Sequence, residues 1–365
     1  MSGGPIEADK PLELSAGMKV AFRILLPILV VVGSAVVAEV GLRGYGFRVP
    51  GFYDADGNPV GTGGTGAHGG PFPQGPGRLV SRDFDVAYVV NHHGFREREP
   101  QAKVPGEWRI GLVGDSHTAG YGVLTEQRFG ELYAAARGAM QPEARLWNLG
   151  LPSTGADHLA VVLGGVGASY DLDEIILAIS GANELGDNAR VAKQPNRQAK
   201  RPRSRFALAI RDNSRLALLM WFYVVHGRLF ERAPPTDFVD KLQRLWPFTE
   251  AGLDHFLEVV DGRPFQIWYL PSTLEWSDYE FERSGLSPGD RHGLRDHIRD
   301  WASRRDVVFI DASPFLTGRP SDEVKFDMDA HYNAAGHRLV AEAAIARLAD
   351  TETHSAATSP PPATP

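Results

Sequence analysis

The stretch that decides the fold is WRIGLVGDSH, residues 108–117. Its first part is a short apolar run that ends in Gly114, and Asp115, Ser116 and His117 follow directly. A run of this length is typical of a strand buried inside a parallel sheet, which leads through a tight turn into a helix. The pattern therefore predicts a strand over residues 108–114 and places the Ser116 hydroxyl at the turn after it.

Four more strand-like segments follow, with helical patterns between them. The predicted strands are 145–150, 174–180, 264–271 and 307–313, and the predicted helices are 126–140, 157–167, 214–230, 249–260, 291–304 and 333–348. Strands that alternate with helices form a parallel sheet covered on both faces. We expect an α/β fold with a doubly wound, flavodoxin-like, five-stranded parallel sheet and a site at the carboxyl ends of its strands.

Polar residues follow three of these strands as well as the first. They form the segments NLGLPSTG at 148–155, GANE at 181–184 and DMDAHYNAAGH at 327–337. Because the carboxyl ends of parallel strands share one edge of the sheet, these segments should meet Ser116 there. Ser116 also begins a helix, whose free N–H groups favour a developing oxyanion. The simpler alternative is a serine that only caps the helix.

Taken together, the four segments resemble the GDSL, or SGNH, hydrolase superfamily. The resemblance covers about two-thirds of the chain, from residue 109 to residue 348, with all four blocks in the family's order. It implies an SGNH-type fold in which Ser116 is the nucleophile and His331 is the base that accepts its proton. An acyl-enzyme on Ser116 would be the intermediate.

The chain departs from the family pattern at the second oxyanion donor. The family's glycine falls on Ser153, with Gly155 two residues later, and both backbone N–H groups are candidates for this role. The N–H of Ser116 would be the first donor, and Asn183 matches the family's third donor.

The chain also departs from the family pattern at the acid that orients the histidine, the third member of the Ser-His-Asp triad. The commonest family spacing puts the acid three residues before the histidine, which is Met328 here. Asp329 is the predicted acid, because the spacing D-x-H also occurs in SGNH-type proteins of exopolysaccharide acetylation. Asp327 is the alternative. His337, six residues after His331, is assigned a structural role.

Composition narrows the chemistry. The chain has 365 residues, a formal charge of −7 and no cysteine. Disulfides, thiolate metal ligands and a cysteine nucleophile are thereby excluded. The mild negative charge argues against nucleic acid as a partner, since nucleic-acid binding needs a basic surface. We predict no cofactor and no metal site, and we interpret His92 and His93 as parts of a surface loop.

Residues 24–42, ILLPILVVVGSAVVAEVGL, are apolar except for Glu39 near the far end. Their length is close to the ~20 residues that a helix needs to cross a membrane. We predict a transmembrane anchor, with residues 1–23 in the cytoplasm and the rest in the periplasm or outside the cell. The alternative is a cleaved signal peptide, because Val36-Val37-Ala38 resembles a small-residue cleavage site.

The remaining segments divide the chain further. Residues 43–105 are predicted to be linker and lead-in, with a flexible Gly- and Pro-rich stretch at 51–78. Residues 106–348 are predicted to form the hydrolase-like domain, and residues 349–365 are predicted to be a disordered tail. The run 190–205 holds seven basic and no acidic residues. It is either a solvated insertion or a contact for anionic headgroups or acidic glycans. The apolar run 216–225 is either a core or lid helix or an in-plane membrane contact.

These features predict a membrane-anchored serine acyl-ester enzyme that acts on glycan or cell-envelope acyl groups. If water resolves the acyl-enzyme, the protein is an esterase or deacetylase; if a sugar hydroxyl does, it is an O-acyltransferase, with a membrane protein as a candidate acyl donor. One alternative is a lipase or lysophospholipase with a lipid substrate. Another is a non-catalytic SGNH-like subunit of an envelope polysaccharide assembly complex.

Overall fold

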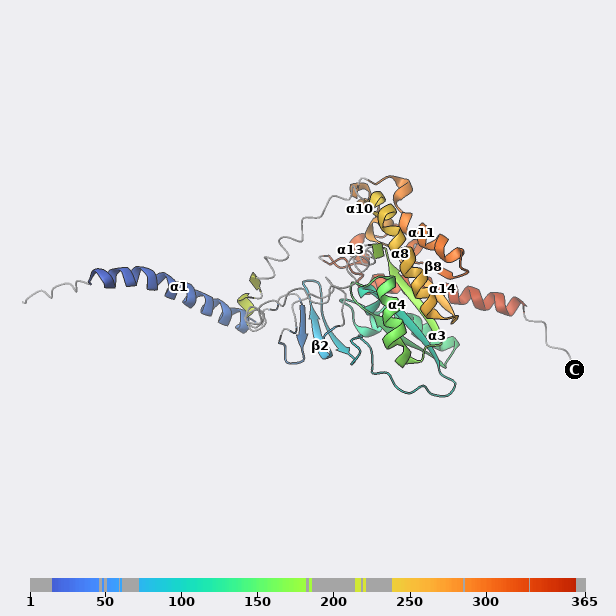
Figure 1. The fold of residues 1–365 in the computed structure, drawn as a ribbon, viewed down its shortest axis with the longest axis horizontal. Coiled ribbons are helices and arrows are strands. Elements are labelled where there is room, and N and C mark those ends of the chain that lie inside the picture. Colours follow the sequence, from blue (N-terminus) through green and yellow to red (C-terminus); the bar gives the residue numbers. More distant parts are fainter. Residues whose placement is uncertain are drawn as a thin grey trace, which may run out of the picture.

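The computed structural model describes most of the predicted domain and the long apolar helix before it. The described residues are 15–45, 48, 51–58, 60, 72–181, 184–185, 214–217, 219–220, 238–284, 286–327 and 329–358. Asn183, Met328 and the basic run 190–205 lie outside these residues, as does most of the apolar run 216–225. The described residues form an α/β body, a small antiparallel sheet beside it and a projecting helix, α1 (Figure 1).

The main sheet has five parallel strands in the order β5-β4-β6-β7-β8. In chain order this is 2-1-3-4-5, which is the flavodoxin-like arrangement and confirms the predicted fold class. The strands are β4 (Trp108–Gly114), β5 (Ala144–Gly150), β6 (Glu174–Ser180), β7 (Phe265–Leu270) and β8 (Val308–Asp311).

Helices cover both faces of this sheet. Successive strand residues point to opposite sides, so Val113 and Leu177 join one apolar cluster while Leu112 and Ile176 join the other. The first cluster is covered by α4 (Ala156–Gly165), α8 (Phe238–Val260) and α11 (Gly293–Ser303). The second is covered by α3 (Phe129–Met140) and α14 (Ala334–Thr358).

Short elements fill the connections at the ends of the strands. They are α2 (Ser116–Ala119), η1 (Thr125–Gln127), η2 (Val166–Tyr170), α9 (Thr273–Trp276), α10 (Asp278–Ser284), η4 (Pro288–Asp290), α12 (Ser313–Leu316) and α13 (Ser321–Val324). The fifth strand ends before the predicted limit of 313, because Ser313 already begins α12 and donates its N–H to Asp311 Oδ1 at 2.8 Å.

Two helices are longer than predicted. Helix α8 begins at Phe238 instead of residue 249 and contains Pro247. Helix α14 continues to Thr358, so residues 349–358 of the predicted disordered tail are helical. The cause is visible in the sequence, since no glycine or proline interrupts the chain between Gly336 and Pro360.

Part of the predicted linker is also folded. An antiparallel sheet is formed by β1 (Gly51–Asp54), β2 (Gly75–Val80) and β3 (Asp85–Val90). Alternate residues of β3 are buried, and they pack with Phe52 and Leu79. The expectation of a flexible linker is therefore wrong for residues 51–54 and 75–78, while residues 61–71 lie outside the described chain. Four of the six residues in DVAYVV are β-branched or aromatic, which is a strand signal in the sequence.

Helix α1 (Ala16–Gly44) carries the apolar segment. The most apolar stretch of Val20–Gly44 has a mean hydropathy of 2.5, and none of it is buried against the body. This helix is compatible with a membrane anchor and with a signal sequence. Near its end, Glu39 accepts hydrogen bonds from the Ser214 hydroxyl at 3.0 Å and the Leu216 N–H at 2.8 Å, which connect the helix to the segment at 214–217.

The approach of α2 to the sheet depends on Gly150 at the end of β5. A Cβ atom there would lie 2.3 Å from the backbone nitrogen of Ala119, which cannot move without displacing α2. We expect Gly150→Ala to lower the free energy of unfolding by about 1–3 kcal/mol through overpacking. The measurement is chemical denaturation of the full chain in detergent, followed by circular dichroism.

Gly138 provides the matched control. It lies in α3, and a Cβ added there would meet no heavy atom within 4 Å, so Gly138→Ala should be neutral or stabilise by about 0.5–1 kcal/mol. Equal effects of the two alanines would contradict the close approach of α2 to β5.

Candidate active site

Ser116 is held at the carboxyl edge of the sheet by the turn between β4 and α2. Asp115 caps α2, since its side chain accepts the His117 N–H at 2.9 Å. The next strand is tied to the same helix, because the Asn148 side chain donates to the Thr118 carbonyl at 2.8 Å and accepts the Gly150 N–H at 3.1 Å. Ser116 is consequently fixed where the sheet edge and a helix N-terminus coincide.

The structure brings Ser116, His331 and Asp329 into one line of hydrogen bonds. Ser116 Oγ lies 2.7 Å from His331 Nε2, and His331 Nδ1 is in close contact with Asp329 Oδ1. The same carboxylate oxygen accepts the His331 backbone N–H at 2.9 Å. Burial alone would raise the pKa of Asp329, but the hydrogen bonds from His331 outweigh it and hold the pKa below its usual value. Asp329 therefore stays ionised beside the imidazole.

Asp327, the alternative acid, is exposed and lines a hollow on the outside of the loop. The carboxylate in contact with the His331 ring belongs to Asp329. Met328, the position of the commonest family spacing, lies outside the described residues. The catalytic assignment of Asp329 stays a proposal, and the geometry favours it over Asp327.

The loop that carries Asp329 and His331 is closed at its base. Lys325 and Tyr332 pair as an isolated antiparallel bridge, and Phe326 donates its N–H to the His331 carbonyl at 3.1 Å. Asn333 joins the loop to two helices. Its side-chain oxygen accepts the Ala335 N–H at 2.9 Å, and its amide donates to the Lys325 carbonyl at 3.1 Å. Asn333 thus caps the start of α14, a position that asparagine favours.

Of the candidate oxyanion donors, the structure describes Ser116, Ser153 and Gly155. Ser153 has a φ of 56°, in the left-handed region that glycine adopts most readily. Gly155 has a φ of −105° at the N-cap of α4, so of the two candidates only Ser153 adopts the left-handed conformation. Asn183 lies outside the described residues.

Comparison with known proteins decides the family. Residues 112–339 match the model of the GDSL-like Lipase/Acylhydrolase family, which is more than half of the chain. The chain belongs to this family. No curated protein matches it.

Several solved structures resemble this GDSL-like acylhydrolase. One is Est24, a carbohydrate acetylesterase from Sinorhizobium meliloti, with 16% identity, a TM-score of 0.37 and coverage of 67% of this chain and 100% of that chain. A lipase/acylhydrolase from Enterococcus faecalis has 15% identity, a TM-score of 0.40 and coverage of 67% and 96%. An aryl esterase from M. smegmatis has 14% identity, a TM-score of 0.37 and coverage of 67% and 99%.

Tyr121 is a site residue that sequence reasoning missed. Its ring stacks on the His331 ring, with centroids 4.5 Å apart and an angle of 27°. Behind it, Phe84 contacts Tyr121 at 5.7 Å and Phe326 at 4.8 Å between ring centroids. The small sheet of this GDSL-like acylhydrolase therefore buttresses the imidazole. The sequence carries no signal for it, because the contact depends on how the lead-in packs on the body.

His337 has the structural place that was expected. Its side chain is fully buried against Phe129, and its Nδ1 accepts the Phe129 N–H at 3.2 Å. Burial holds the pKa of His337 well below its usual value. It is therefore neutral and holds α14 to the start of α3.

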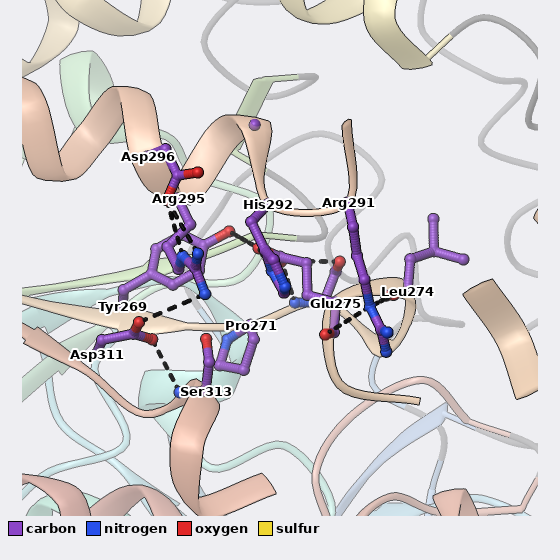
Figure 2. Close-up of polar contacts among 12 residues, drawn as sticks. Tyr269, Pro271, Leu274, Glu275, Arg291, His292, Arg295, Asp296, Asp311 and Ser313 are labelled. Atoms are coloured by element: carbon purple, nitrogen blue, oxygen red, sulfur yellow. Dashed lines mark hydrogen bonds and ion pairs between the residues drawn. The ribbon is translucent and has the colours of Figure 1, made fainter. Parts of the chain in front are cut away.

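A second buried titratable group, Glu275, lies at the carboxyl end of β7 (Figure 2). Its carboxyl group accepts hydrogen bonds from the Tyr269 hydroxyl at 2.8 and 2.9 Å and from the Ser272 N–H at 2.7 Å. Gly181 directly follows β6 and begins the segment GANE. A Cβ atom added there would lie 2.6 Å from Glu275 Oε2. In the same turn, the Pro271 carbonyl accepts a hydrogen bond from the Tyr332 hydroxyl at 2.5 Å. Glu275 thus braces a turn that contacts the Gly181 loop and the residue after His331.

Glu275 should give this acylhydrolase a pH-dependent stability. Burial raises the pKa of Glu275 from 4.5 to about 7. Its stabilising contribution is therefore complete below pH 4.5 and is lost as the pH rises through about 7. The Glu275→Gln variant cannot ionise, so it should gain on the order of 3 kcal/mol relative to wild type between pH 4.5 and pH 8. Thermal unfolding of the full chain in detergent at each pH measures this trend.

Glu258→Gln is the control, because Glu258 is exposed on α8 and should show no such trend. If the stability difference between Glu275→Gln and wild type stayed constant over this pH range, the raised pKa would be wrong.

Proposed function

We propose that this chain is a membrane-anchored serine acyl-ester enzyme that works through an acyl-enzyme on Ser116. The observation that carries the proposal is the continuous line from Ser116 Oγ through the His331 ring to Asp329. A serine that merely capped α2 would not need an imidazole 2.7 Å from its hydroxyl. Family membership supports the same reaction class, since the matched region contains both Ser116 and His331.

The first half of the reaction forms the acyl-enzyme. Ser116 Oγ attacks the ester carbonyl as its proton passes to His331 Nε2, and Asp329 holds the ring through Nδ1 and stabilises the imidazolium. The carbonyl oxygen becomes an oxyanion, for which we propose the N–H groups of Ser116 and Ser153 or Gly155 and the side chain of Asn183 as donors. When the carbon–oxygen bond to the alcohol breaks, His331 returns the proton to the leaving alkoxide.

The second half releases the acyl group. His331 accepts a proton from water, the resulting hydroxide attacks the acyl carbonyl, and the carboxylic acid leaves as Ser116 recovers its proton. An esterase or deacetylase follows from this route. A sugar hydroxyl in place of water would make the protein an O-acyltransferase, with a membrane acyl-donor protein as partner. Ser116, His331 and Asp329 have the same roles in either case, because the sugar hydroxyl gives its proton to His331 as water does.

The proposed substrates are acyl groups on cell-envelope or extracellular glycans. The apolar helix α1 supports an enzyme that is tethered at a membrane, because Val20–Gly44 is long and apolar enough to span a bilayer. We place the catalytic domain outside the cytoplasm as part of the same proposal. The same helix would suit a lipase or lysophospholipase that acts on lipids at the membrane surface. The line of hydrogen bonds at Ser116 argues against a non-catalytic subunit.

A fluorophosphonate probe tests for an activated serine. We expect the full chain in detergent to be labelled, and Ser116→Ala to abolish labelling because the reactive oxygen is gone. His331→Ala should reduce labelling by at least about a hundredfold, since the general base is lost. In-gel fluorescence measures both effects. Unlabelled wild-type protein, or persistent labelling of Ser116→Ala, would sink the proposal.

The acid can be identified by a matched pair of variants. Asp329→Asn should lower kcat for 4-nitrophenyl acetate on the order of 10³- to 10⁴-fold, because the amide favours the wrong tautomer of His331. Asp327→Asn changes an exposed side chain outside the line of hydrogen bonds and should cost less than about threefold. A larger loss from Asp327→Asn than from Asp329→Asn would move the triad to Asp327.

A further inference from the structure

A hollow of about 720 Å³ opens beside the loop that carries His331. One wall is formed by α9 and α10, which follow β7, and the other by residues 318–322 and 325–327, which follow β8. Both walls therefore rise from the carboxyl edge of the sheet, the edge that also holds Ser116. Figure 1 shows α10 and α13 toward the same end of the body. The volume is that of small-molecule sites, which measure about 300–1,000 Å³.

We propose that this hollow binds an uncharged carbohydrate, the polyhydroxylated part of the acylated substrate. The proposal rests on the proposed function and names the substrate class of the same site. The hollow reaches the catalytic loop directly, because Asp327 on its rim is two residues before Asp329. Lys325, another lining residue, pairs through its backbone with Tyr332, the neighbour of His331. A sugar chain in the hollow would lie against the loop that presents the imidazole.

The charges of the hollow favour a neutral ligand with many hydroxyls. Carboxylates accept hydrogen bonds from hydroxyl groups, whereas lysine and arginine donate to hydroxyl oxygens. A polyanion would be repelled by the carboxylates, which outnumber the basic groups among the lining residues. The carboxylates are Asp278, Glu280, Asp322 and Asp327, and the basic groups are Arg319 and Lys325.

The hollow also offers an aromatic face. The Tyr279 side chain lines it and is 65% exposed, which is a large exposed area for an aromatic residue. A ring with an apolar face and a hydroxyl at its edge suits the apolar face of a sugar and its hydroxyls together.

The wall that bears Tyr279 is built before any ligand arrives. Arg291 donates through Nε to the carbonyls of Leu274 and Glu275, at 3.2 and 3.0 Å (Figure 2). It also donates through Nη1 to Asp278 at 2.7 Å. Its guanidinium also lies over the Phe281 ring, 4.7 Å from the centroid. One arginine thereby joins α9 to α10. A fixed wall lowers the entropic cost of binding.

The test measures binding in the full chain with the nucleophile removed. Full-length Ser116→Ala in detergent is titrated calorimetrically with a neutral oligosaccharide, xylohexaose, with an anionic one, hexaguluronate, and with phosphocholine. We expect xylohexaose to bind and Tyr279→Ala to weaken its Kd about tenfold through the loss of the aromatic face. Tyr279→Phe keeps the ring and should retain most of the affinity. Asp300→Asn, an exposed carboxylate on α11 outside the hollow, should leave the Kd unchanged.

The outcomes separate this inference from the enzyme proposal. Absence of xylohexaose binding, equal affinity of Tyr279→Ala, or tighter binding of hexaguluronate or phosphocholine would overturn the carbohydrate assignment. Hydrolysis of 4-nitrophenyl acetate by the wild-type chain is measured in parallel and does not require the hollow to be occupied. If wild type fails to hydrolyse it while xylohexaose binds in a Tyr279-dependent way, the enzyme proposal falls and the binding site stands.

Discussion

The hydrogen bond of 2.7 Å between Ser116 and His331 joins two residues that are 215 positions apart in the chain. Only a structure that returns both residues to one edge can close such a contact, and the parallel sheet does so because every strand ends on the same side. Ser116 begins α2, which follows β4, and His331 lies after β8, in the loop that precedes α14. The contact thus depends on the order and number of strands between them. Each covering helix supports this alignment indirectly by keeping the strands in register.

The imidazole is constrained from two further directions. From one side Tyr121 stacks on the His331 ring, and Phe84 from the small sheet packs behind Tyr121. From the other side the turn after β7 accepts the hydroxyl of Tyr332, while Glu275 holds that turn through Tyr269 and Ser272. A general base works best when its ring cannot rotate away from the nucleophile. The lead-in and the Glu275 turn therefore belong to the architecture of the site, although neither needs to touch a substrate.

The carboxyl edge combines two environments that suit different parts of an ester. Around Ser116 the groups are buried, so charge that develops on the acyl carbonyl meets few competing water molecules. A short distance along the His331 loop the surface opens into a hollow with exposed polar groups and the Tyr279 ring. A buried site next to an open polar hollow suits an ester whose acyl group is small and whose alcohol part is larger and polar. The overall charge of −7 gives no hint of this local balance of acids and bases.

Much of the fold could be predicted from the sequence because its signals are local. The five apolar runs that end in glycine, serine or proline indicate the strands, and the segments after them indicate the polar edge. The prediction failed for the lead-in sheet and for the end of the last helix. Residues 85–90 bury alternate side chains only once β3 pairs with β2. The last turns of α14 continue because no glycine or proline stops them.

By itself, the sequence determined the strands of a parallel sheet and the residues expected at its edge, since apolar periodicity and motif order depend on neighbours along the chain. It left Asp329 and Asp327 as alternatives and gave no sign of Tyr121 or Glu275. The tertiary structure decided those points, because which carboxylate contacts an imidazole, which ring stacks on it and which acid is buried depend on the path of the loop between β8 and α14 and on the packing of segments far apart in sequence.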